Sequence, residues 1–208
     1  MVDNLRMLCY NGEEKKCEVS FMQKEAKKQP RGARLLRLTY IAMAAALISV
    51  CAWITVPGVI PFTMQTFAVF FVLLFLGGKA GTVAVLLYLA IGAMGFPVFS
   101  NFSGGLGILL GPTGGYLIGF LFSALCYWAT ERWTGAHRRF LFLILPLMMV
   151  LCYVCGTVWY CVYFAGERSV MQAFLACVVP FLLPDGCKIA LAWFLSAVIR
   201  RQLRAHRD

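Results

Sequence analysis

The chain has 208 residues, of which 61% are apolar or aromatic and only 13% are charged. An ordinary soluble domain carries about 25% charged residues, and a chain of this length has too small an interior to bury so much apolar surface. The composition therefore excludes a disordered or water-soluble protein and predicts an all-α integral membrane protein. At about 20 residues per spanning helix, the length accommodates about six helices and no motor domain driven by nucleotides.

Six apolar runs are predicted to form six membrane-spanning helices. In chain order they cover residues 38–56, 62–76, 81–94, 113–130, 140–164 and 170–199. The second and third runs are short for upright spanning helices, and two prolines interrupt the sixth. We expect a six-helix membrane domain over 38–200, preceded by a basic cytosolic tail over 1–37 and followed by a basic cytosolic C-terminus over 201–208.

The basic residues predict the orientation of these helices. The net charge is +10, and the basic groups flank apolar runs rather than forming a polar face, which disfavours nucleic acid as a partner. Six spans place the nine basic residues of the tail, Lys79, the three arginines between 132 and 139 and the four C-terminal arginines on one side. The other side receives Arg168 alone. This partition predicts a multi-pass protein of the cell membrane with both termini in the cytoplasm.

The sixth run holds the most conspicuous polar groups, Asp185 and Lys188. Ionisable side chains are costly inside a bilayer and usually face a cavity or a partner. The two residues are three apart, so they share one face of a helix, which Pro180 and Pro184 bend. This pattern favours a ligand-binding site over the alternative, an ion pair that only holds two helices together.

A long connection, residues 95–111, follows the third run and is rich in glycine and aromatic residues. Long ordered loops are often functional, so it is interpreted either as a lid over a pocket or as a packed surface loop. Gly107, Gly111, Gly115 and Gly119 recur every four residues in and after it. We expect close helix packing at the last two, and loop conformation to explain the glycines before Pro112.

Two further patterns lie in the first and second runs. Ala42 and Ala46 form a small-xxx-small pattern, which suits either internal packing or a docking strip for another membrane helix. Gln65 offers a hydrogen-bond donor and an acceptor at the start of the second run.

The residues that enzymatic, nucleotide-binding and metal sites usually require are absent from the predicted spans. The two histidines, His137 and His206, lie at the predicted cytosolic edges, and no phosphate-binding Gly-x-x-x-x-Gly-Lys-Ser/Thr loop is present. Asp185 is the only carboxylate well inside a predicted span. We therefore expect no enzyme, no catalytic residue, no metal and no cofactor.

Several motifs, in this order and spacing, resemble a known family. They are PFTMQTF at 61–67, LLYL at 86–89, GFPVF at 95–99, GGLG at 104–107, LGPTGGY at 110–116 and Pro180-x4-Asp185-x-x-Lys188. Together they resemble the BioY family, the biotin-binding S components of energy-coupling-factor (ECF) transporters. The resemblance covers about residues 38–200.

The resemblance implies a six-helix protein that captures biotin from outside. It also implies uptake with a transmembrane coupling protein and two cytosolic ATPases. In this fold family the first helix carries an Ala-x-x-x-Ala motif for docking to the coupling protein, which Ala42 and Ala46 match.

Biotin fits the polar residues chemically. Asp185 is expected to accept a hydrogen bond from a ureido N–H, and Lys188 to meet the ureido oxygen or the carboxylate. Asn101, Gln65 and Tyr116 are expected to complete the polar shell, while the partner of the biotin carboxylate stays open. The alternatives are an S component for another vitamin and a small-molecule carrier that works without ATPases.

Overall fold

The computed structural model describes residues 31–56, 58, 61–134, 138–164, 171, 174–175 and 178–205. The chain divides into two units, Met1–Thr39 and Tyr40–Asp208. The first unit is described only from residue 31, where α3 begins, and the cavity and the side-chain contacts reported below lie in the second. The predicted tail up to residue 30, His137, Arg168 and His206 lie outside the described residues.

Each predicted apolar run forms a helix. The helices are α3 (Arg31–Trp53), α4 (Gln65–Leu76), α5 (Gly78–Ala93), α7 (Gly114–Thr134), α8 (Arg138–Tyr163) and α10 (Val179–Ala205). Two short elements, η1 (Ser100–Phe102) and α6 (Leu106–Leu109), lie in the connection between α5 and α7. The prediction of a helical protein is therefore confirmed, while α10 begins at Val179, nine residues into the sixth predicted run.

Three of these helices are long and apolar enough to cross a bilayer. The qualifying segments are Gly32–Trp53, Leu143–Tyr163 and Val179–Gln202, which supports a multi-pass membrane protein. Helices α4 and α5 are shorter, with 12 and 16 residues. Only Gly77 separates them, with a φ of +83° that favours glycine, so the chain turns directly from one helix into the next.

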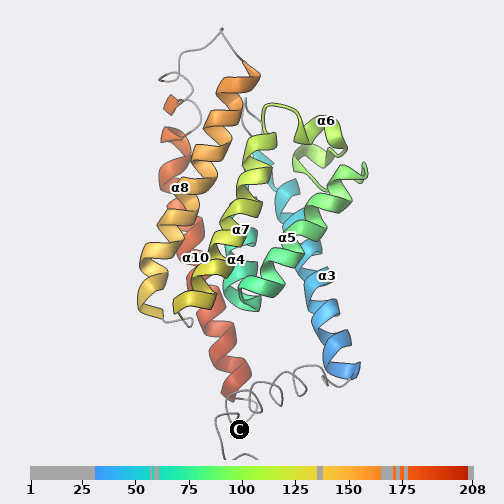
Figure 1. Ribbon diagram of the computed structural model, residues 1–208, viewed down its shortest axis with the longest axis vertical. Helices are drawn as coiled ribbons and strands as arrows, with labels where there is room; N and C mark the ends of the chain where they lie inside the picture. Colours follow the sequence, from blue (N-terminus) through green and yellow to red (C-terminus); the bar gives the residue numbers. More distant parts are fainter. Residues whose placement is uncertain are drawn as a thin grey trace, which may run out of the picture. The chain divides into compact units, whose positions relative to one another are not determined.

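Helix α4 lies inside the helical unit rather than on its surface. It packs against α10 and α5, while α7 packs against α8 and α5 (Figure 1). Ala68, Val69, Phe70 and Leu73 of α4 are completely buried. A short helix that is apolar on all sides is stable when its neighbours enclose it, and this explains why the second run has no polar face.

The last two glycines of the repeat pack closely, as the spacing predicts. A side chain at Gly115 would place its Cβ 2.2 Å from Cβ of Trp159, and one at Gly119 would lie 3.1 Å from Cα of Cys152. Both contacts bring α7 close to α8. A Cβ at Gly107 would meet nothing within 4 Å. The last two glycines therefore serve helix packing. Gly107 lies within α6 and is not among the glycines with a positive φ, so its place in the backbone does not require a glycine.

A small hairpin joins α3 to α4 and was not predicted. Strands β1 (Thr55–Val56) and β2 (Phe62–Thr63) pair antiparallel, with Thr55 opposite Thr63. The amide of Met64 also donates to the carbonyl of Ile54 at 3.1 Å. The all-α description thus holds for the helices but not for this connection, where two extended segments satisfy each other's backbone groups.

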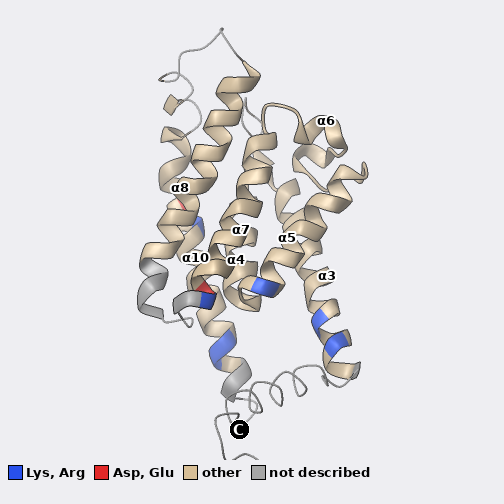
Figure 2. Cartoon of the chain, in the orientation of Figure 1, with Lys and Arg blue, Asp and Glu red and all other residues tan. Residues whose placement is uncertain are grey.

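Charged side chains cap the adjoining termini of the two short helices, α4 and α5. The guanidinium of Arg200 donates to the carbonyl oxygens of Leu74 and Phe75 at the C-terminus of α4. The carboxylate of Glu131 accepts from the amide of Gly78 at the N-terminus of α5. A cation at a helix C-terminus and an anion at a helix N-terminus both complement the helix dipole. Figure 2 shows basic segments of α5, α7 and α10 near this same end.

Candidate functional site

A cavity opens among α4, α7, α8, α10 and the connection between α5 and α7. Counted with its open mouth, it encloses about 740 Å³ of space free of protein atoms. It is lined by Pro61, Thr63, Gln65, Thr66, Phe70, Phe99, Ser100, Ile108, Thr113, Tyr116, Leu117, Phe120, Met149, Cys152, Tyr153, Phe181, Asp185 and Lys188. Aromatic and aliphatic side chains make up most of the wall, and the charged groups come from one helix.

Asp185 and Lys188 face this cavity from the first turns of α10. Lys188 Nζ lies 2.8 Å from Asp185 Oδ1, and the two residues are only 6% and 5% exposed. Pro184 lies inside the helix directly before them. The spacing of three residues on one helix face therefore creates a buried ion pair on the cavity wall, as the sequence predicts.

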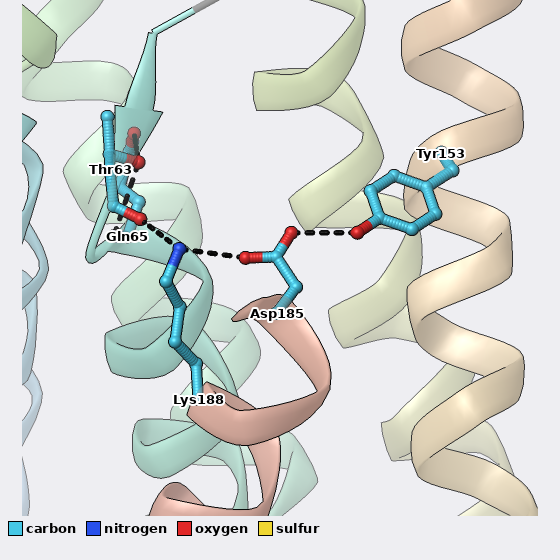
Figure 3. Close-up of polar contacts among 5 residues, drawn as sticks. All are labelled: Thr63, Gln65, Tyr153, Asp185 and Lys188. Atoms are coloured by element: carbon cyan, nitrogen blue, oxygen red, sulfur yellow. Dashed lines mark hydrogen bonds and ion pairs between the residues drawn. The ribbon is translucent and has the colours of Figure 1, made fainter. Parts of the chain in front are cut away.

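Three further groups, which the sequence did not indicate, contact this ion pair. The hydroxyl of Tyr153 donates to Asp185 Oδ2 at 2.8 Å, and Lys188 Nζ donates to the carbonyl oxygen of Thr63 at 2.7 Å (Figure 3). The ammonium also lies 3.5 Å from the centre of the Phe62 ring, a cation–π contact. Each charge thus has a partner besides the other charge, which a buried ion pair needs.

Gln65 and Tyr116 also line the cavity, as expected. The Gln65 side chain donates to the hydroxyl of Tyr88 and lies 3.3 Å from the hydroxyl of Thr63. Tyr116 packs over Gly156, where a Cβ would lie 2.3 Å from the Tyr116 ring. Four of the five predicted ligand-binding side chains, those of residues 65, 116, 185 and 188, are therefore brought together from three helices.

Asn101, the fifth, lies elsewhere. It is exposed, it is not part of the cavity lining, and its φ is +56°. Its neighbour Ser100 lines the cavity in its place. The left-handed backbone of the η1 turn, which the sequence does not indicate, separates the two neighbouring side chains.

The predicted docking strip, Ala42 and Ala46, lies on an exposed side of α3. Ala42 and Ala46 are exposed, together with Met43. Ala44 and Ala45, by contrast, are 7% and 2% exposed and belong to the apolar core. Within the described residues, the small-xxx-small pair therefore does not serve packing inside this chain.

Comparison with known proteins identifies the family. The model of the BioY family matches residues 22–205, beginning earlier than the motif resemblance over 38–200. The chain belongs to the BioY family. This BioY-family chain is 37% identical to a probable biotin transporter BioY of Pyrococcus horikoshii, over 76% of this chain and 93% of that protein.

Other relatives agree. Over 80 residues, which are 38% of this chain and 47% of its relative, it is 58% identical to a biotin transporter BioY of Thermotoga maritima. A similar solved structure is the S-component for biotin from an ECF-type ABC transporter. It has a TM-score of 0.73 and 25% identity, over 83% of this chain and 95% of that one. The BioY-family chain therefore has the S-component fold.

Proposed function

We propose that this chain is the biotin-binding membrane subunit of an ECF-type vitamin uptake transporter. It captures biotin in the cavity beside Asp185 and Lys188 and delivers it with an ATP-driven coupling module. The observation that carries the proposal is the buried pair facing a cavity in a chain of the BioY family. The function is binding and transport, not catalysis.

The chemistry of biotin suits the cavity. Its ureido group has two N–H donors and one carbonyl acceptor, and its bicyclic body is largely apolar. We propose that Asp185 accepts from a ureido N–H and that Lys188 donates to the ureido oxygen or to the carboxylate. The cavity is also lined by Phe70, Phe120 and Met149. We propose that these apolar side chains pack against the bicyclic body of biotin.

The remaining polar shell is proposed to include Gln65 and Tyr116, because both line the same cavity. Asn101 stays a prediction, since its side chain is exposed at the turn beside the cavity. The alternative that the ion pair is purely structural is disfavoured by its position on the cavity wall rather than at a closed helix contact.

We propose that all six helices span the membrane, with both termini in the cytoplasm. Support comes from the gathering of basic segments at one end of the helices of the second unit (Figure 2) and from the basic residues of the N-terminal stretch. A fluorescent protein that matures only in the cytoplasm, fused after Asp208, tests this arrangement. Fluorescence is expected, and its absence from a well-expressed fusion would contradict the orientation.

The partners proposed are a transmembrane coupling protein, two cytosolic ATPases and membrane lipid. The exposed Ala42 and Ala46 on α3 support a close approach by a helix of the coupling protein, because small side chains let two backbones approach. Exposed apolar residues of α8, such as Leu143, Leu147 and Val154, suit contact with lipid.

Titration of the purified full-length chain with biotin tests the binding function. We expect saturable binding of biotin and none of riboflavin, thiamine or folate under the same conditions. Binding of another vitamin in preference to biotin would support an S component of different specificity. Uptake by vesicles that hold this chain alone and no ATP would instead support an independent carrier.

A further inference from the structure

The connection between α5 and α7 forms one wall of the cavity. The cavity is lined by three residues of this connection, Phe99, Ser100 and Ile108. They lie between α5 and α7, outside both of these long helices. What holds this wall in place therefore decides whether a bound ligand stays enclosed. A backbone hydrogen bond from Gly105 to the carbonyl of Gly92 at 2.7 Å ties the connection to α5. Two aromatic side chains attach it near Ser100, one on the core side and one on the exposed side.

The core-side attachment is Phe99, which is only 1% exposed. Its ring meets the Tyr88 ring edge to face, with centroids 5.5 Å apart. The ring also covers Gly92, where a Cβ would lie 2.0 Å from a Phe99 ring atom. This contact fixes the beginning of the turn, and the amide of Phe99 donates to the carbonyl of Ser103 at its end at 2.9 Å.

The exposed-side attachment is Trp53, the last residue of α3. Its indole N–H donates to the carbonyl oxygen of Pro97 at 2.9 Å, and its ring stacks on Phe102 at 5.0 Å with an interplanar angle of 27°. A single side chain thus contacts the wall on both sides of Ser100. Neither contact partner is close to Trp53 in the sequence.

The turn between these contacts is strained. Asn101 and Phe102 have φ values of +56° and +55°, in the left-handed region that residues other than glycine rarely adopt. Phe102 is also 63% exposed, so burial does not hold it in this conformation. Strained backbone persists where surrounding contacts impose it. Ser103 closes the turn with hydrogen bonds to Phe99 and Ser100, and Trp53 adds the contacts that reach it from another helix.

The same end of α3 also adjoins the charged side of the cavity. Ile54, directly after Trp53, accepts from Met64, and the neighbouring hairpin residue Thr63 offers its carbonyl to Lys188. The end of α3 is therefore joined to two walls of the cavity, through Trp53 to the turn and through the hairpin to the lysine.

We propose that Trp53 is a positioning residue that clamps the turn at 97–102 over the cavity and thereby slows the release of bound ligand. The inference rests on the proposed function, in which that ligand is biotin. Trp53 is not part of the cavity lining, so it acts through the turn and not by touching biotin. Loss of the clamp should let the strained turn relax away from the cavity.

The test is the rate at which labelled biotin leaves the purified full-length chain after a chase with unlabelled biotin. Trp53→Ala removes one hydrogen bond and one ring contact, so dissociation should accelerate about fivefold or more while association changes little. Trp53→Phe keeps a ring but loses the donor, and should give an intermediate rate. Trp193→Ala on α10 is the matched control, because Trp193 is 37% exposed against 38% for Trp53 and lies outside the cavity lining.

Phe102→Ala tests the same contact from the other side and leaves α3 intact. Because both variants break one stacking contact, the double variant should dissociate more slowly than the product of the two single effects predicts. An unchanged dissociation rate in Trp53→Ala that still binds biotin, or an equal effect of Trp193→Ala, would overturn this inference alone. A wild-type chain that binds no biotin would overturn the proposed function as well.

Discussion

The hydroxyl of Tyr153 on α8 donates to Oδ2 of Asp185 on α10 across 2.8 Å, while Oδ1 of the same carboxylate accepts from Lys188. The two residues are 32 positions apart in the chain. Tyr153 therefore fixes the plane of the carboxylate from a neighbouring helix, and each carboxylate oxygen keeps a lone pair for a further donor. The ion pair is thus held in one orientation before any ligand arrives.

Removing either charge should weaken biotin binding strongly. Asp185→Asn and Lys188→Ala are each expected to cost about 2 kcal/mol or more, because each loses a charged hydrogen-bond partner and leaves the other charge buried alone. Calorimetric titration of folded variants with biotin measures this cost. An unchanged affinity in folded Asp185→Asn would remove this residue from the site.

Tyr153→Phe should have a smaller effect of the same sign. The variant keeps the ring but leaves Asp185 Oδ2 without its donor, so we expect a loss of about 1–2 kcal/mol in biotin affinity, or roughly tenfold. Tyr163→Phe is the control, because Tyr163 lies on the same helix and is 52% exposed. Equal affinities in the two variants would show that Tyr153 does not orient the carboxylate.

The docking strip should separate binding from uptake. Ala42→Leu and Ala46→Leu add bulk on the exposed side of α3, so we expect normal biotin binding but lost co-purification with the coupling protein. Val154→Leu, on an exposed part of α8, is the control and should affect neither measurement. If the alanine variants lost biotin binding to the same degree, the strip would belong to the internal packing of the chain.

The glycine repeat supplies a matched pair for stability. Gly115→Ala would place a methyl group 2.2 Å from Trp159 Cβ, and should lower the free energy of unfolding by about 1–3 kcal/mol. Gly107→Ala meets no atom within 4 Å and should change it by less than about 0.5 kcal/mol. Thermal unfolding in detergent compares the two. Similar midpoints would contradict the close contact between α7 and α8.

The sequence by itself determined the class of protein, the helices and the charged pair. These depend on local physics: apolar runs must leave water, and two residues three apart on one helix share a face. The spacing within one helix therefore sufficed to place Asp185 beside Lys188. The same reasoning indicated that Ala42 and Ala46 share a face, but not whether that face is covered.

Only the tertiary structure decided which distant groups meet the pair. The Thr63 carbonyl lies 125 positions from Lys188, and Tyr153 reaches Asp185 from another helix, so helix packing and not local spacing brings them together. It also decided that Asn101 lies outside the cavity and Ser100 inside it, because the left-handed backbone of the turn sets where each side chain points. Long-range contacts such as the one between Trp53 and Phe102 hold that turn, and no pattern of neighbouring residues encodes them.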